Sequence, residues 1–275
     1  MKFVVIPDVH IGRESVFINP WDKWYCFLKR IPTNEAVAGK AIIERLKRAV
    51  RWINAHPEIE FVISIGDITD SGTPEQLRKA SQICNEIRVP FIPLIGNHDL
   101  WPYQRQGKEI IWEAKEPISI EEFECYFKNW RTSPLFKNVQ KQKGVFQNFA
   151  FSIRDTHFVI VDNNNRRKAP FGLPGQAGWA KLHPESYFWL QKEILSTQET
   201  KIIILSHAPL NRRLLEKLQK LTGKYLINIA GHKHKRTCLN KKNVMTVTVN
   251  ALYHEPLILI VETFKQVIKI EYQKI

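Results

Sequence analysis

The sequence lacks the features that would place the protein in a membrane or in an oxidising compartment. Its four cysteines, Cys26, Cys84, Cys125 and Cys238, are far apart and form no Cys-x-x-Cys pair. In a chain of 275 residues this usage indicates reduced thiols and argues against a zinc knuckle. No apolar run is long enough to cross a bilayer, and the run over 3–6 is too short for a signal peptide. We therefore expect a soluble, cytoplasmic protein without a membrane span.

Internal repeats and low-complexity tracts are also missing, and acidic residues are scarce beside basic ones. The chain has 27 Asp and Glu residues against 41 Lys and Arg residues, which gives a formal net charge of +14. Such an excess favours phosphate-bearing substrates, nucleic acid or anionic surfaces as partners. A solvated basic surface without a binding role is the other interpretation.

Short β-rich runs alternate with longer helical patterns, which is typical of an α/β protein. Before residue 146 we expect strands over 3–6, 61–65 and 91–95, and helices over 36–55, from 73 onward and over 120–130. After it we expect a hairpin of 149–153 with 157–161, helices over 185–195 and 211–221, and strands over 201–206, 225–230, 244–249, 257–261 and 267–272. Pro90 and Pro93 indicate an edge position or irregular pairing for the third strand.

Five of the expected strands end just before residues that can bind a metal ion. These ends carry Asp8-Val9-His10, Gly66-Asp67, Gly96-Asn97-His98-Asp99, Ser206-His207 and Gly231-His232-Lys233-His234. In open α/β sheets, ligands gather at the carboxyl ends of the strands. Each motif alone is commonly a turn or a packed histidine, but together they predict one shared metal site. A site that draws on residues 8 to 234 favours one domain over 1–275, with insertions near 13–35 and 100–146.

The five motifs, in this order, resemble the calcineurin-like metallophosphoesterase superfamily. Its pattern is Asp-x-His, Gly-Asp, Gly-Asn-His-Asp or Glu, His, and Gly-His-x-His. A strand over 157–161, then Asp162, a loop and a helix bearing Trp189-Leu190 are similar to the cyclic-nucleotide-phosphodiesterase-like branch. The resemblance implies an α/β fold with four layers, α/β/β/α, in which two mixed sheets pack together with helices outside.

The resemblance also implies a role for each matching residue. The first of two metal ions would be held by Asp8, His10, Asp67 and His234. The second would be held by Asp67, Asn97, His207 and His232, so that Asp67 bridges the ions. Carboxylate, amide and imidazole ligands suit manganese, with iron or zinc as alternatives, better than calcium or magnesium.

His98 follows a predicted ligand and is expected to be catalytic rather than a ligand itself. It would stabilise the transition state or protonate the leaving group, with Asp99 orienting its imidazole. Thr69 and Asp70 are interpreted as groups behind the ligands or as turn residues. The basic residues at 233, 235 and 236 flank the last ligands and are interpreted as solvated loop charges rather than as phosphate-binding groups.

These residues predict an enzyme, a metal-dependent phosphoesterase. We expect a phosphodiesterase or phosphatase that acts on a nucleotide-like small molecule by attack of metal-activated water. The alternative is a nuclease acting on DNA or RNA, favoured by the net charge and by basic clusters at 166–168, 212–213 and 233–236. The chain offers no extra length for a DNA-capture domain, and a non-catalytic scaffold is disfavoured because all expected ligands are present. An aromatic stretch over 17–27 is hypothesised to be a lid that selects substrates.

Overall fold

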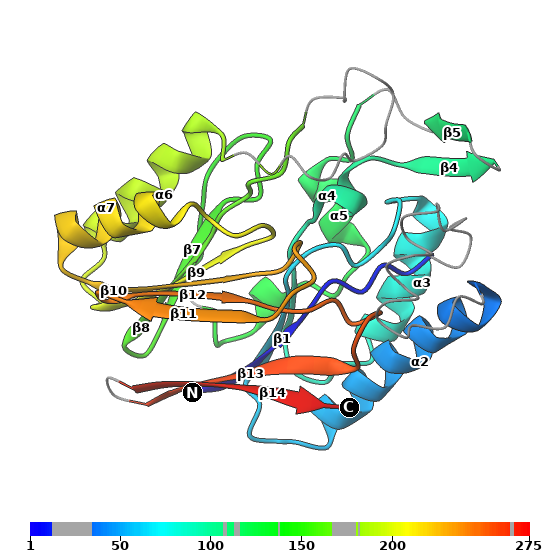
Figure 1. Ribbon diagram of the computed structural model, residues 1–275, viewed down its shortest axis with the longest axis horizontal. Helices are drawn as coiled ribbons and strands as arrows, with labels where there is room; N and C mark the ends of the chain where they lie inside the picture. The colour runs from blue at the N-terminus through cyan, green and yellow to red at the C-terminus, as the bar shows by residue number, and fades with distance from the viewer. Residues whose placement is uncertain are drawn as a thin grey trace.

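The computed structural model describes residues 1–12, 35–106, 109–112, 116–136, 138–166, 180, 182–264 and 267–275. The hypothesised lid over 17–27, and nearly all of the insertion expected near 13–35, lie outside the described residues. Two β-sheets dominate the described part, with helices α2 and α3 on one side and α6 and α7 on the other (Figure 1).

The first sheet has, among the described residues, five strands in the order β14-β13-β1-β2-β3. Its elements are β1 (Lys2–Ile6), α2 (Glu35–Asn54), β2 (Phe61–Ser64), α3 (Pro74–Cys84), β3 (Phe91–Pro93), β13 (Leu257–Phe264) and β14 (Val267–Lys274). Strands β1, β2 and β3 are parallel, while β13 and β14 pair in antiparallel fashion. The hydroxyl of Thr73 accepts a hydrogen bond from the backbone N–H of Gln76 at 3.3 Å and caps α3. Strand β3 lies at an edge, as its prolines predict.

The second sheet has, in the part of the chain that the structure describes, seven strands in the order β11-β12-β10-β9-β8-β7-β6. Its strands are β6 (Gln140–Lys141), β7 (Phe149–Ile153), β8 (Thr156–Ile160), β9 (Lys201–Ser206), β10 (Tyr225–Ala230), β11 (Thr237–Lys241) and β12 (Val244–Thr248). The helices beside it are α6 (Pro184–Ser196) and α7 (Arg212–Thr222). Strands β8, β9, β10 and β12 are parallel and the others antiparallel, so this sheet is mixed as well.

The region 100–146 differs from its prediction. After α4 (Asn97–Leu100), its described elements are β4 (Tyr103–Gln106), β5 (Glu109–Trp112), α5 (Ile120–Cys125), the 3-10 helix η2 (Trp130–Thr132) and β6 of the second sheet. The helix expected over 120–130 therefore ends at Cys125. The side chain of Asn85 donates to the carbonyl of Tyr126 at 3.2 Å and accepts from the backbone N–H of Lys128 at 2.9 Å. These tertiary bonds take up backbone groups that a longer helix would use.

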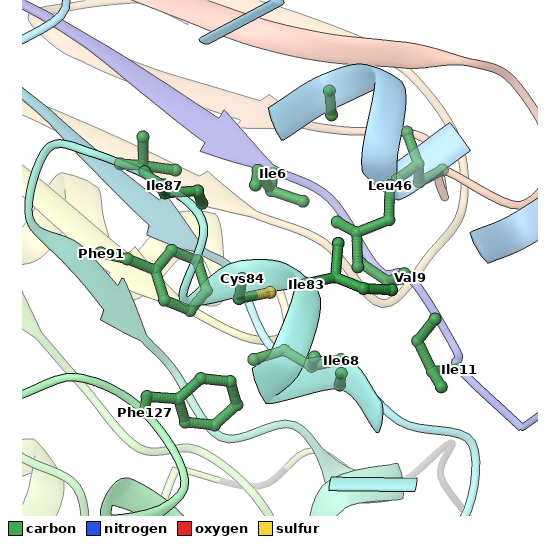
Figure 2. Packing of buried hydrophobic residues seen from close by; sticks show 14 of the residues in the cluster. Ile6, Val9, Ile11, Leu46, Ile68, Ile83, Cys84, Ile87, Phe91 and Phe127 are labelled. Atoms are coloured by element: carbon green, nitrogen blue, oxygen red, sulfur yellow. The ribbon is translucent and has the colours of Figure 1, made fainter. Parts of the chain in front are cut away.

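Buried hydrophobic side chains form three layers of core. Between the sheets, Phe3 stacks on Phe61 at 4.8 Å and meets Phe158 edge-on at 5.4 Å. Beneath α2 and α3, Leu46 and Ile83 pack against residues of the first sheet and its loops (Figure 2). The outer face of the second sheet packs against Trp189, Leu190, Leu215 and Leu218 of α6 and α7. These layers confirm the predicted α/β/β/α arrangement.

The described cysteines Cys84, Cys125 and Cys238 are free thiols, as expected. None of the described helices combines the length and the apolar composition that crossing a bilayer requires. The assignment of the whole chain to one domain stays a prediction.

Candidate metal centre

The loops that follow β1, β2 and β10 turn sharply, and candidate site residues form the turns. His10, Asp67, His232 and His234 have φ angles of 58°, 50°, 64° and 48°. Positive φ is uncommon for residues with a Cβ and costs free energy. The loops also hold each other, since the backbone N–H groups of Val9 and His10 each donate to the carbonyl of Asp67 at 2.9 Å. Strained turns that support one another indicate that the positions of these side chains matter for function.

A first group of side chains gathers where β1, β2 and β10 end. One ligand atom from each of Asp8, His10, Asp67 and His234 lies within 4.8 Å of the others. The Nε2 atom of His234 is 3.0 Å from Oδ2 of Asp8, and Nε2 of His10 is 3.6 Å from Oδ2 of Asp67. The backbone N–H of His232 donates to Oδ2 of Asp8 at 2.7 Å and fixes that carboxylate.

A second group is formed by Asp67 with His207 and His232. The Nε2 atom of His207 is 3.2 Å from Oδ2 of Asp67. The side-chain oxygen of Asn97 lies 2.9 Å from Nε2 of His207 and 3.0 Å from Nδ1 of His232. The structure thus brings all seven sequence-predicted ligands together, in two groups that share the carboxylate of Asp67.

The chemistry of the donor set fits divalent cations. Oδ1 of Asp8 is buried and has no hydrogen-bond partner among the described residues, which is costly for a carboxylate oxygen unless a cation satisfies it. Burial opposes ionisation of Asp67, but the charges of His207, His98 and His10 hold its pKa well below the usual value. Burial, together with the charge of His207, lowers the pKa of His232 to about 4, so its imidazole is neutral as metal binding requires.

His207 is the exception within the second group. Burial alone would lower its pKa, but the carboxylates of Asp67 and Asp8 outweigh burial and raise the pKa to about 10. A cation held by His207 and Asp67 would replace the proton of His207 and supply the positive charge that neutralises the carboxylate. The two buried groups are consistent with a dinuclear metal site.

His98 lies beside the first group without joining it. Its backbone N–H donates to Oδ1 of Asp67 at 2.9 Å, and its ring meets the ring of His10 edge-on at 4.7 Å. The Nδ1 atom is 2.6 Å from the carbonyl oxygen of Asp70, so Nδ1 carries the proton and donates it there. The side chain is 20% exposed. Its Nε2 atom is therefore the nitrogen with which His98 can meet a substrate.

The prediction that Asp99 orients the His98 imidazole is wrong. The carboxylate of Asp99 accepts hydrogen bonds from the backbone N–H groups of Ile68, Thr69 and Gly96 and from the Thr69 hydroxyl, at 2.7–3.2 Å. Burial and the charge of Asp67 raise its pKa to about 6. Asp99 thus fastens the loop after β2 to the start of α4, and Asp70 orients His98 instead.

Asp70 lies behind the ligands, as its interpretation from the sequence suggested. Its Oδ1 atom is 3.2 Å from Nδ1 of His10, which leaves Nε2 of His10 turned toward Asp67. A carboxylate on the far nitrogen of a histidine fixes its tautomer and ring orientation.

Comparison with known proteins assigns the chain to a family. Residues 1–236 match the profile of the calcineurin-like phosphoesterases. The chain belongs to this family. The buried Asp and His groups are consistent with the metal-dependent chemistry of phosphoesters for which the family is named.

Two curated relatives are similar over parts of their length. A probable glycerophosphodiester phosphodiesterase GpdQ from Arcobacter nitrofigilis is 26% identical over 210 residues, which cover 70% of this chain and 64% of the relative. A probable cyclic nucleotide phosphodiesterase from Rhodopseudomonas palustris is 32% identical over 103 residues, which cover 36% of this chain and 30% of the relative. The chain thus matches less than two thirds of the length of either relative.

Solved structures share the fold. GAP50, the anchor in the inner membrane complex of Plasmodium, has a TM-score of 0.57 at 11% identity, covering 99% of this chain and 84% of that one. Purple acid phosphatase PPD1 from yellow lupin seeds has a TM-score of 0.53 at 16% identity, covering 100% of this chain and 51% of that one. At these identities the likeness shows the fold alone.

Sequence reasoning missed two residues of this metallophosphoesterase site. Tyr253, between β12 and β13, places its hydroxyl 2.9 Å from Nδ1 of His234. Arg45 of α2 donates to the carbonyls of Leu252 and Tyr253. Neither belongs to a motif, and only the fold brings them to the ligands.

Gly231 lies so close to the first group that a side chain at this position would displace a ligand. A Cβ at this position would lie 2.1 Å from Oδ1 of Asp8 and 2.9 Å from a methyl carbon of Ile65. Gly231→Ala should therefore push the Asp8 carboxylate away from His234 and weaken binding of one manganese ion at least about tenfold. Isothermal titration of the purified variant with manganese measures this.

Gly223→Ala is the matched control. Nothing lies within 4 Å of an added Cβ there, but its φ of +67° makes alanine unfavourable by about 1 kcal/mol or more. We expect a lower melting temperature and unchanged manganese binding. Wild-type manganese affinities in Gly231→Ala would show that Asp8 is not a ligand or that it is easily rearranged.

Proposed function

We propose that the chain hydrolyses phosphodiester bonds in nucleotide-like small molecules with two divalent metal ions, of which manganese is the first candidate. The observation that carries this proposal is the pair of buried ligand groups that share Asp67. Both curated relatives are named as phosphodiesterases of small substrates, a glycerophosphodiester and a cyclic nucleotide. Their names support a diester as the substrate class.

Each side chain has a defined part in this reaction. Divalent ions bound at the two groups would polarise a water molecule and the phosphoryl oxygens. Asp67 would hold both ions, and Asp8, fixed by the backbone N–H of His232, would hold the first. His98, whose Nδ1 proton is committed to Asp70, would use Nε2 either to donate a proton to the departing oxygen or to stabilise charge on the phosphoryl group.

The nuclease alternative is weakened by how the basic clusters are paired. Arg166, Arg212 and Arg236 each form an ion pair with an acidic side chain, in order Asp162, Glu216 and Glu255. Pairing reduces the positive field that a nucleic-acid backbone would meet. Arg167 and Lys168 lie outside the described residues. The basic clusters thus give less support to a polynucleotide substrate than the sequence alone suggests.

A substrate panel with added manganese tests the proposal. Its members are cyclic nucleotides, glycerophosphodiesters, dinucleotide pyrophosphates, bis(p-nitrophenyl) phosphate, p-nitrophenyl phosphate and single-stranded DNA and RNA. We expect small diesters to give kcat/KM values at least about tenfold above those of monoesters, and chelation to abolish both activities. The highest kcat/KM on single-stranded nucleic acid would favour the nuclease, and turnover of monoesters alone would make the enzyme a phosphatase.

A further inference from the structure

We propose that Tyr253 is the positioning residue of the first metal group, and that Arg45 holds Tyr253 in place from helix α2. The proposal rests on the proposed function, because it concerns a metal ion bound by Asp8, His10, Asp67 and His234. Tyr253 lies outside residues 1–236, the segment that matches the family profile. The matched segment therefore does not include this residue.

The first step of the argument is the contact with His234. The Tyr253 hydroxyl is 2.9 Å from Nδ1 of His234, while Nε2 of the same ring is 3.0 Å from Oδ2 of Asp8. The two ring nitrogens therefore have separate partners. A histidine that binds a metal through Nε2 is neutral and carries its proton on Nδ1, which needs an acceptor. With a cation on Nε2, the Tyr253 oxygen would be that acceptor, and the contact would then favour the tautomer that leaves Nε2 free to bind.

The second step concerns the ring of Tyr253. It lies 5.1 Å from the ring of His10 and 5.3 Å from the ring of His234, at interplanar angles of 88° in both cases. Edge-to-face contacts of this kind are favourable and restrict ring rotation. One tyrosine thus borders both imidazoles of the first group. By contrast, the ligands of the second group have Asn97 and the carbonyl of Ile65 as partners.

The third step is the anchoring of the loop that carries Tyr253. The backbone N–H of Leu252 donates to the carbonyl of Asp8 at 2.8 Å, and the Leu252 side chain is fully buried. The Arg45 guanidinium donates to the carbonyl of Leu252 at 3.2 Å and to that of Tyr253. Helix α2 is itself fixed on the first sheet by Leu46, the neighbour of Arg45. A continuous series of contacts therefore leads from α2 through Tyr253 to His234.

The test compares two tyrosine-to-phenylalanine variants. Tyr253→Phe removes the hydroxyl but keeps the ring, and Tyr272→Phe removes a hydroxyl that donates to the carbonyl of Thr248 at 2.9 Å. Both tyrosines are half-buried, so the control matches in burial, and it differs in that its hydroxyl bonds a backbone carbonyl rather than a predicted ligand. In Tyr253→Phe we expect one of two manganese ions to bind about 10–100-fold more weakly and the other unchanged. In Tyr272→Phe both affinities should equal those of the wild type.

A spectroscopic measurement separates positioning from loss of structure. Long-range 1H–15N NMR of the zinc-loaded protein reports which imidazole nitrogen carries the proton, and a His234→Gln variant assigns the signal. We expect His234 to be protonated at Nδ1 in the wild type, and its Nδ1 shift to change in Tyr253→Phe while the melting temperature holds. Arg45→Met should weaken binding of the same manganese ion, although the hydroxyl of Tyr253 is still present.

The outcomes distinguish this inference from the proposed function. A wild-type protein that binds fewer than two manganese ions overturns both. The positioning role alone is overturned if the wild type binds two manganese ions and Tyr253→Phe binds them with the same two affinities and gives the same His234 NMR signal. Equal weakening of the affinity for both manganese ions in Tyr253→Phe also overturns the positioning role, because the contacts of Tyr253 involve only the first group.

Discussion

Replacing Asp67 by asparagine is expected to remove metal binding at both groups and to lower kcat/KM by about 10³-fold or more. One electrostatic group typically contributes about 10²–10³-fold, and this carboxylate faces both ligand groups. Its Oδ2 atom lies 3.2 Å from Nε2 of His207 and 3.6 Å from Nε2 of His10. Asparagine keeps the shape and an oxygen for the backbone N–H of His98, but it loses the charge that two cations would share. Metal content after manganese loading and gel filtration, together with kcat/KM, measures the effect.

Asp155→Asn provides the matched control for this substitution. Asp155 forms an ion pair with Lys201 and its side chain is 55% exposed. That variant should keep two metal ions and full activity. His10→Gln should have a smaller effect than Asp67→Asn, because His10 belongs to the first group but not to the second. Full metal content and activity in Asp67→Asn would mean that Asp67 does not bridge two ions.

His98→Ala should leave both metal ions in place and reduce activity according to the leaving group. General acid catalysis contributes about 10²–10⁴-fold, and it is needed most when the departing oxygen is a poor leaving group such as an alkoxide. We therefore expect a loss of that size on alkyl and ribose phosphodiesters and a smaller loss on nitrophenyl esters. Steady-state kcat/KM on matched alkyl and nitrophenyl diesters, with metal content determined in parallel, makes the comparison.

His56→Ala is the control histidine variant, since His56 stacks on Trp52 at 3.7 Å at the end of α2, away from the ligands. It should change neither leaving-group dependence nor metal content. Equal losses on both esters in His98→Ala would assign His98 to the phosphoryl oxygens rather than to the departing oxygen. Loss of a metal ion would make His98 a ligand and contradict the proposed roles.

The residues that local patterns could identify are those at strand ends. Asp8, Asp67, Asn97, His207 and His232 each follow an apolar run, and parallel strands bring such ends to one edge of the fold. The apolar runs and the helical spacing between them also predicted the order of most strands and helices. Strand β11 escaped prediction because it is an exposed edge strand whose side chains show no apolar alternation.

The parts that sequence could not predict depend on contacts between distant segments. The orientation of Asp99 is set by backbone donors about 30 residues away in the loop after β2. The end of α5 is set by Asn85, and the position of Tyr253 by Arg45. No spacing within the chain encodes these partners, because each bond requires the packed fold to exist first.

The distribution of the ligands over the two sheets has a thermodynamic consequence. Asp8, Asp67 and Asn97 follow strands of the first sheet, whereas His207, His232 and His234 follow strands of the second. Cations held by both sets would act as crosslinks between the halves of the sandwich, joining segments as far apart as residues 8 and 234. Because the unfolded chain cannot offer this arrangement, metal binding is linked to folding and adds about 2.7 kcal/mol per ion when free metal is about 100 times the dissociation constant. The folding equilibrium of the chain would thus be coupled to the availability of these ions, and metal depletion would destabilise the packing of the two sheets as well as stop the proposed catalysis.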